Sequence, residues 1–261
     1  MNYKIAETMN TEAKARNTQF QLTLGDNIYY YGKTFEDLYS GEYLQNDWYM
    51  IAGNHDYWGN ISAQILYTQV SKRWKYPDYY YTKTFTSPDG ATIEFVMVDT
   101  MIICGTVEKE GEQPKPFDDK EAEEEEWAWI EEKLANSTAD YLVVGGHYPV
   151  YSAGFHGPTE RLVERMKPLL YQYNVSAYFS GHDHTLQDGE MDYMVTGSAT
   201  NSLNIRWHKD DVPPGSLKFW NADTVDGGFA AVSVNKELLT FTFISGEGLE
   251  LYQTTVKPRS L

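Results

Sequence analysis

Near-continuous apolar runs recur along the first two thirds of the chain, and such runs are typical of strands that are buried on both faces. They cover residues 20–24, 48–52, 93–99, 141–144 and 177–179. Between them, residues 62–74, 117–134 and 159–173 repeat apolar side chains at the spacing of one helix face. Strands that alternate with helices in this way predict a layered α/β fold.

The last third of the chain has a different pattern, with short runs that are rich in aromatic and β-branched residues. These runs are residues 192–195, 228–234 and 239–245, and the polar residues 235–237 between the last two are typical of a hairpin turn. A second, more antiparallel sheet is therefore expected, so the fold class is predicted to be α/β, as a four-layer α/β/β/α sandwich. No linker-like stretch divides the sequence, and residues 1–261 are predicted to form a single domain.

The chain is strongly acidic, with 38 aspartates and glutamates against 21 lysines and arginines and a formal net charge of -17. This balance predicts no nucleic acid and no anionic membrane as partners. No apolar stretch approaches the roughly 20 residues of a membrane helix, and residues 1–20 lack the apolar core of a secretory signal. The acidic run at residues 121–126 is interpreted as the solvent-facing side of a helix near its N-terminus.

The single cysteine, Cys104, excludes an internal disulfide, so cysteine usage neither requires nor excludes an oxidising compartment. Three glycosylation sequons begin at Asn60, Asn136 and Asn174, which is close to the number that chance gives in this composition. Together these observations leave the compartment open.

Five segments lead from an apolar run through a small residue to a potential metal ligand. They are TLGDNIY (23–29), IAGNHD (51–56), VVGGHYP (143–149), GFHGP (154–158) and YFSGHDH (178–184), and they hold five of the six histidines. Strand ends that carry glycine allow donor groups from distant parts of the chain to crowd together. The pattern therefore predicts a clustered, dinuclear metal site.

The residue types in these segments suit transition metals. Asp26 follows a glycine at a strand end, where its carboxylate can bridge two cations, although taken alone it is also typical of a turn or helix cap. Asn54 offers an amide oxygen to a divalent ion. His147, His182 and His184 offer imidazole nitrogens, which suit zinc, iron and manganese better than magnesium or calcium.

In their order and separations, GDNIY, GNHD, GGHYP and GHDH resemble the metallophosphoesterases, and among them the purple acid phosphatases of the tartrate-resistant type. The similarity extends through AGNHDYWGNISAQI, SKRW, GGHYPVYSAGFHGPT and SGHDHTLQ and covers the chain from Ala6 onward. It implies a monomeric acid phosphatase that hydrolyses phosphomonoester small molecules or phosphoproteins by in-line attack of a metal-bound hydroxide. A secreted or lysosomal glycoprotein is implied as well.

The resemblance also implies a role for individual residues. The six metal ligands would be Asp26, Tyr29, Asn54, His147, His182 and His184. Asp26 would bridge the ions, Tyr29 and His184 would hold Fe(III), and the other three would hold a divalent ion, which is Fe(II), Zn or Mn. Two further histidines would be catalytic.

These catalytic residues are His55 and His156, which stand beside the ligand positions of their motifs. Either histidine could stabilise or protonate the leaving alkoxide. Two alternatives stay open at this point. One is a phosphodiesterase or nucleotidase of the same fold, and the other is an inactive homologue that acts as a binding protein.

The chain departs from the family pattern in two places. Family members begin with a strand that ends in Asp-x-Gly, whose carboxylate binds the ferric ion, whereas MNYKIAETMNTEAKARN resembles the helix that follows that strand. A truncated N-terminus is the expected explanation, because without that strand its neighbours keep unpaired backbone groups. In addition, Cys104 matches a family cysteine whose disulfide partner position is occupied here by Arg161, so that bridge is absent.

Overall fold

The computed structural model describes residues 3–28, 35–106, 114, 119–189, 193–199, 202–221 and 227–260. The strands are β1 (Phe20–Leu22), β2 (Asp47–Tyr49), β3 (Trp74–Lys75), β4 (Tyr81–Thr86), β5 (Thr92–Met97), β6 (Tyr141–Gly145), β7 (Ala177–Ser180), β8 (Leu186–Asp188), β9 (Tyr193–Thr196), β10 (Phe219–Trp220), β11 (Gly228–Val234), β12 (Leu239–Ser245) and β13 (Glu250–Val256). The α-helices are α1 (Tyr3–Arg16), α2 (Phe35–Leu38), α3 (Ile61–Leu66), α4 (Thr100–Cys104), α5 (Lys120–Asn136) and α6 (Lys167–Gln172). Short 3-10 turns occupy Glu42–Leu44, Asp56–Trp58 and Tyr67–Gln69, and a π-helical segment, Leu162–Met166, leads into α6.

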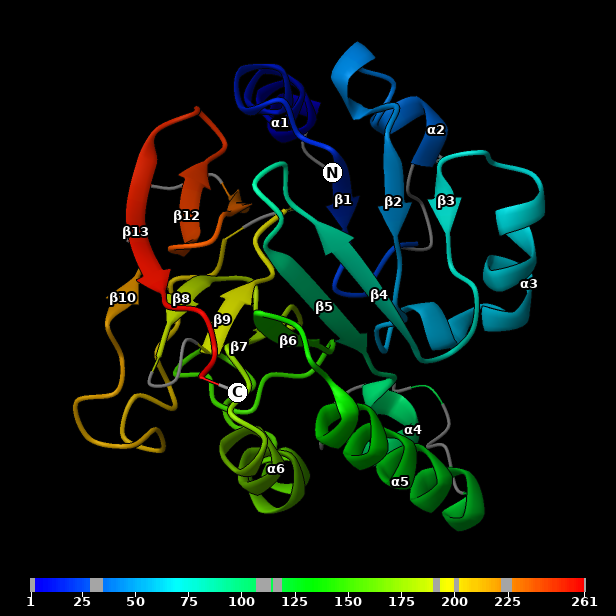
Figure 1. The fold of residues 1–261 in the computed structure, drawn as a ribbon, viewed down its shortest axis with the longest axis vertical. Helices are drawn as coiled ribbons and strands as arrows, with labels where there is room; N and C mark the ends of the chain where they lie inside the picture. Colours follow the sequence, from blue (N-terminus) through cyan, green and yellow to red (C-terminus); the bar gives the residue numbers. More distant parts are fainter. Residues whose placement is uncertain are drawn as a thin grey trace.

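Within the described residues the strands form three sheets. The largest has seven strands in the order β10-β8-β9-β7-β6-β5-β4, and the two others are β1-β2-β3 and β11-β12-β13. Strands β5, β6, β7 and β9 run parallel to one another, with antiparallel strands at both edges of their sheet. Helices α4, α5 and α6 lie on one side of this sheet, while α1, α2 and α3 lie beside the sheet of β1, β2 and β3 (Figure 1). This arrangement agrees with the predicted α/β/β/α sandwich.

The central strands are buried on both faces, as their sequence predicts. All five residues of β6 are buried. In β5, Phe95 packs toward Trp48 and Phe241 in a core shared with the smaller sheets, while Val96 belongs to the core that contains Ile130 of α5. Because successive side chains of a strand point to opposite faces, the seven-stranded sheet needs an apolar layer on each side.

Most predicted elements are confirmed, and two interpretations are wrong. Residues 62–74 were expected to form one helix, but α3 ends at Leu66, a 3-10 turn follows, and Trp74 pairs in β3 with Trp48 of β2. The acidic run on α5 is only partly a solvent-facing surface, because Glu123 and Glu126 are buried. In both cases contacts with distant segments override the local pattern. No helix among the described residues is long and apolar enough to cross a membrane.

A cavity of about 950 Å³ lies between β1 and β11. Both strands line it over their whole length, together with Met9 and Ala13 of α1 and the rings of Phe95, Phe179 and Phe241. In the described ranges β1 pairs only with β2 and β11 only with β12, so one edge of each strand has no strand partner.

Candidate metal centre

The loops that follow β1 and β2 approach each other so closely that glycine is required. Gly25 and Asp26 both adopt left-handed backbone angles, with φ of 89° and 55°. A Cβ atom at Gly25 would lie 2.7 Å from the Cα of Gly53 and would overlap the ring of His147. The three motifs that carry Asp26, Asn54 and His147 therefore meet at one point because two of them contain glycine there.

His147 lies where the three motifs meet, and its Nε2 faces Asn54 and Asp26. Its Nδ1 lies 2.6 Å from the carbonyl oxygen of Leu24, which favours the tautomer that leaves Nε2 as an acceptor. Nε2 lies 2.9 Å from Asn54 Oδ1 and 3.5 Å from Asp26 Oδ1. Two ligands of one metal ion, each bonded at about 2.0–2.2 Å, are separated by about 3 Å, so these three donor atoms are spaced as neighbouring ligands would be.

His182 lies beside this group and is almost fully buried. Its ring centroid is 5.1 Å from that of His147 and 4.0 Å from that of His156, on which it stacks. Burial lowers the pKa of His182 well below its usual value, and the neighbouring histidines, including His184 and His55, lower it further. The ring is therefore neutral, which is the form that binds a metal.

The other sequence-predicted residues have different positions. The backbone N–H of His55 donates to Asp26 Oδ1 at 3.0 Å, so the backbone of this histidine contacts the predicted bridging carboxylate. His184 lines the cavity next to β1 together with Asp26, His147 and His182. Tyr29, the predicted ferric ligand, lies outside the described residues.

Asp56 has a positioning role that the sequence interpretation missed. It is buried, and its carboxylate accepts hydrogen bonds from the backbone N–H groups of Gly53, Asn27 and Ile28 and from the side chain of Gln64. Burial and then the charge of Asp26 raise its pKa to about 6. The aspartate ties the loop after β2 to the loop after β1.

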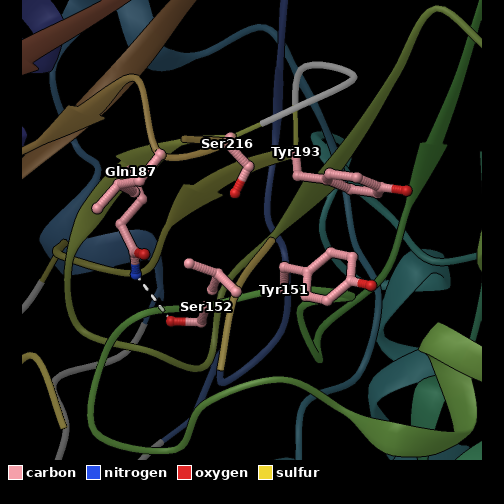
Figure 2. Close-up of a pocket in the computed structure, with 8 residues that line it drawn as sticks. Tyr151, Ser152, Gln187, Tyr193 and Ser216 are labelled. Carbon is pink, nitrogen blue, oxygen red and sulfur yellow. Dashed lines mark hydrogen bonds between the residues drawn. The ribbon is translucent and has the colours of Figure 1, made fainter. Parts of the chain in front are cut away.

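Asp183 has the same role between two other motifs. It is fully buried, accepts a hydrogen bond from the hydroxyl of Ser152, and accepts another from the backbone N–H of His156 at 3.0 Å. Gln187 supports Ser152, since its Nε2 donates to the serine oxygen at 2.8 Å (Figure 2). Ser152, Gln187 and Ser216 are among the residues that line a cavity of about 10 Å³. The sequence signal that could have revealed both aspartates is that each directly follows a motif histidine.

The donor atoms around His147 form a mixed set of oxygen and nitrogen ligands. In the part of the chain that the structure describes, no three histidine, cysteine, aspartate or glutamate side chains form a metal-binding group by themselves. Asp26 and His147 are instead joined by the amide oxygen of Asn54. These three donors and the neutral His182 fit a divalent transition metal, which accepts mixed oxygen and nitrogen ligands.

Comparison with known proteins identifies the family. The sequence profile described as "Metallophos: Calcineurin-like phosphoesterase" matches residues 2–186. The chain belongs to the calcineurin-like phosphoesterases. Within this family, its similarity to tartrate-resistant acid phosphatases is confirmed by curated relatives. Tartrate-resistant acid phosphatase type 5 of Oryctolagus cuniculus is 38% identical over 262 residues, which cover 92% of this chain and 80% of that protein.

Other relatives are acid phosphatases as well, and they support the same family assignment. The human tartrate-resistant acid phosphatase type 5 is 36% identical, with 97% of this chain and 85% of that protein covered. Purple acid phosphatase 7 of Arabidopsis thaliana is 26% identical, with 98% and 81% covered. This homology makes the chain a metal-dependent phosphoesterase by descent and implies a dinuclear metal centre.

Solved structures confirm the metallophosphoesterase fold. The structure described as "GAP50 the anchor in the inner membrane complex of Plasmodium" matches with a TM-score of 0.83 and 23% identity, over 100% of this phosphoesterase and 85% of that chain. Purple acid phosphatase PPD1 from yellow lupin matches with a TM-score of 0.68 and 14% identity, over 98% and 49%.

Proposed function

We propose that the chain is an acid phosphatase that hydrolyses phosphomonoesters at a centre of Fe(III) and a divalent ion. The observation that carries the proposal is the convergence of Asp26 Oδ1, Asn54 Oδ1 and His147 Nε2 from three separate motifs, next to the neutral ring of His182. Bound metal ions polarise phosphoryl oxygens and make a nucleophile available at low pH.

The proposed ligands form two groups. Asn54, His147 and His182 would hold the divalent ion, Fe(II), Zn or Mn, and Asp26 would be shared. Tyr29 and His184 would hold Fe(III), which favours a phenolate ligand. A local positive centre of this kind also explains how a phosphate ester could bind a chain with a net charge of -17.

Two histidines are proposed to protonate the leaving group. The ring of His156 stacks on that of His182, and its backbone is fixed by Asp183. His55 is fixed by the hydrogen bond from its backbone N–H to Asp26. Either ring, when protonated, can donate to the ester oxygen as the bond to phosphorus breaks.

The test combines metal analysis with a substrate panel. We expect two metal ions per chain, faster turnover of p-nitrophenyl phosphate than of bis-p-nitrophenyl phosphate, and loss of metal and turnover in His147→Ala. His208→Ala is the matched control for metal content, because His208 pairs with Asp211 outside the cluster. Tyr29→Phe should remove the visible phenolate–iron band. A colourless protein with two zinc ions would contradict Fe(III), and preference for the diester would favour a phosphodiesterase.

A non-catalytic role is the second candidate. GAP50 of Plasmodium is described as an anchor in the inner membrane complex, and the match to its fold covers the whole of this chain. A purified protein that binds metal ions at neither position and turns over neither ester would favour this candidate over an enzyme.

A further inference from the structure

Asp99 and Glu126 form a buried pair of carboxyl groups that the proposed mechanism does not use. Both residues are fully buried. Asp99 caps α4, where its side chain accepts the backbone N–H of Met101 at 2.9 Å, and its own backbone N–H donates to Oε1 of Glu126 on α5 at 2.8 Å. The carboxyl pair therefore joins the start of α4 to α5.

Tyr57 connects the carboxyl pair to the loop that carries Asn54 and His55. Its hydroxyl donates to Asp99 Oδ2 at 2.7 Å, and its backbone N–H donates to the carbonyl oxygen of Asn54 at 3.2 Å. The same residue is thus bound to the pair through its side chain and to the loop through its backbone. A displacement of Asp99 reaches the loop within one residue.

Glu126 has one oxygen that no donor satisfies. Among the residues that the structure describes, its buried Oε2 has no hydrogen-bond partner, and an ionised carboxylate without donors is costly to bury. Burial raises the pKa of Asp99 to about 7, and burial followed by the charge of Asp99 raises the pKa of Glu126. Two negative charges side by side repel each other, so the pair keeps a proton in acid and loses it near neutral pH.

The titratable groups around the carboxyl pair do not neutralise a second negative charge. In the described part of the chain they include one aspartate, four tyrosines and the cysteine, namely Asp56, Tyr57, Tyr76, Tyr80, Tyr178 and Cys104. Arg161 is the cation beside Cys104, but it is already paired with Glu123. A proton is therefore the simplest way to remove the repulsion within the pair.

We propose that Asp99 and Glu126 share one proton in acid and, through Tyr57, position the loop of Asn54 and His55, so that this loop loosens when the proton is lost to solvent. Once both groups are ionised, water must enter the pair or the two segments must separate, and Tyr57 moves with Asp99. For its effect on turnover the inference rests on the proposed function, but for its effect on the loop it does not.

Hydrogen exchange of the purified protein, followed by mass spectrometry, tests the loop directly. After correction for the intrinsic pH dependence of exchange, protection of residues 53–58 should fall about tenfold from pH 6 to pH 8, because a group with a pKa of about 7 goes from about 90% to about 10% protonated. Glu126→Gln should keep its protection at pH 8, since an amide stays neutral. Glu125→Gln is the matched control, an exposed neighbour on α5 with the same charge change, and it should behave like the wild type.

Tyr57→Phe separates positioning from stability, because it leaves the carboxyl pair in place and removes its bond to the loop. Its unfolding free energy should still fall with pH as in the wild type, whereas the protection of residues 53–58 should be low at both pH values. A pH dependence of protection that survives in Tyr57→Phe would overturn the link through this residue. Equal protection of the wild type at pH 6 and pH 8, or a wild-type response in Glu126→Gln, would overturn the shared proton.

Turnover distinguishes this inference from the proposed function. With p-nitrophenyl phosphate, the ratio of kcat at pH 8 to kcat at pH 6 should be about tenfold higher in Glu126→Gln than in the wild type, and an equal ratio would contradict the effect on turnover. A loop that responds to pH as expected, in a protein that turns over no phosphate ester, would support the shared proton and refute the proposed function. An active phosphatase whose loop ignores pH would do the reverse.

Discussion

The cavity between β1 and β11 predicts how the chain responds to an added strand. The perturbation is a segment of about six apolar residues that ends in Asp-x-Gly, placed ahead of Tyr3, since strands of five to six residues are common. Such a strand, followed by α1 and β1, would form a βαβ unit and would pair with β1 in parallel. We expect it to fill the cavity of about 950 Å³ and to hydrogen-bond with the open edges of β1 and β11.

The magnitude follows from the surroundings of that strand. Burying six aliphatic side chains contributes about 12 kcal/mol, at about 2 kcal/mol each. Ordering six residues costs about the same, at about 2 kcal/mol each. About six hydrogen bonds to the two strand edges, each worth about 1 kcal/mol, then leave a net gain of about 6 kcal/mol. For a chain of this size, that gain corresponds to a rise in Tm of about 10 °C or more.

Differential scanning fluorimetry, iron content and p-nitrophenyl phosphate turnover measure the response. Two matched variants of the added segment separate its effects. Proline at alternate positions removes backbone donors and should abolish the rise in Tm. Asparagine in place of its aspartate should keep the rise in Tm but lose the gain in iron. If the extended chain matched the original in Tm, iron content and turnover, the reasoning about the cavity and the ferric site would be wrong.

Three further predictions concern buried side chains and the histidines proposed to be catalytic. Asp183→Asn should lower kcat about tenfold or more with little change in KM, because an amide cannot accept both hydrogen bonds that fix the His156 loop; an unchanged kcat would contradict this. His55→Ala and His156→Ala should each lower kcat by about 100-fold at unchanged metal content, and loss of metal would make either one a ligand. Burial raises the pKa of Asp99 to about 7 and, together with the Asp99 charge, raises that of Glu126. The folded chain therefore binds protons there that unfolded carboxyls release near pH 4, so this contribution to stability is present below about pH 4 and is lost as pH rises through 7. Unfolding free energies between pH 4 and 7 should fall more steeply in the wild type than in Glu126→Gln, and parallel curves would refute the assignment.

The strands that the sequence predicts best are those whose burial leaves the fewest alternatives. Residues 93–99 and 141–144 are near-continuous apolar runs, and they contain most of β5 and β6 at the centre of the sheet. The sequence interpretation missed β4 and β13, because half-exposed edge strands mix polar and apolar residues and resemble loops. Glu126 was misjudged for a related reason. Its oxygen accepts the backbone N–H of Asp99, a partner 27 positions away that no local pattern indicates.

Some residues of the site could be predicted from sequence motifs, whereas others are identified only by the fold. The strand-end motifs were sufficient to predict that Asp26, Asn54 and His147 lie together. Asp26 and Asn54 follow two parallel neighbours, β1 and β2, whereas His147 follows β6 of another sheet. His208 lies outside every motif, yet it packs against Gly157. Its position beside Gly157 depends on the backbone conformation of residues 202–212. The sequence of this segment has no periodicity from which that conformation could be predicted.

In the two His-Asp pairs, His55-Asp56 and His182-Asp183, the adjacent residues have different roles in the site. In each pair the histidine lies at the proposed metal centre or beside it, while the following aspartate is buried and hydrogen-bonds to a neighbouring loop. Asp56 holds the loop after β1, and Asp183 holds the loop that carries His156. A buried carboxylate is stable only if donors surround it, so each aspartate requires the partner loop to be present in one conformation. The proposed ligands and catalytic histidines are therefore positioned by residues beside them in sequence that face away from the site.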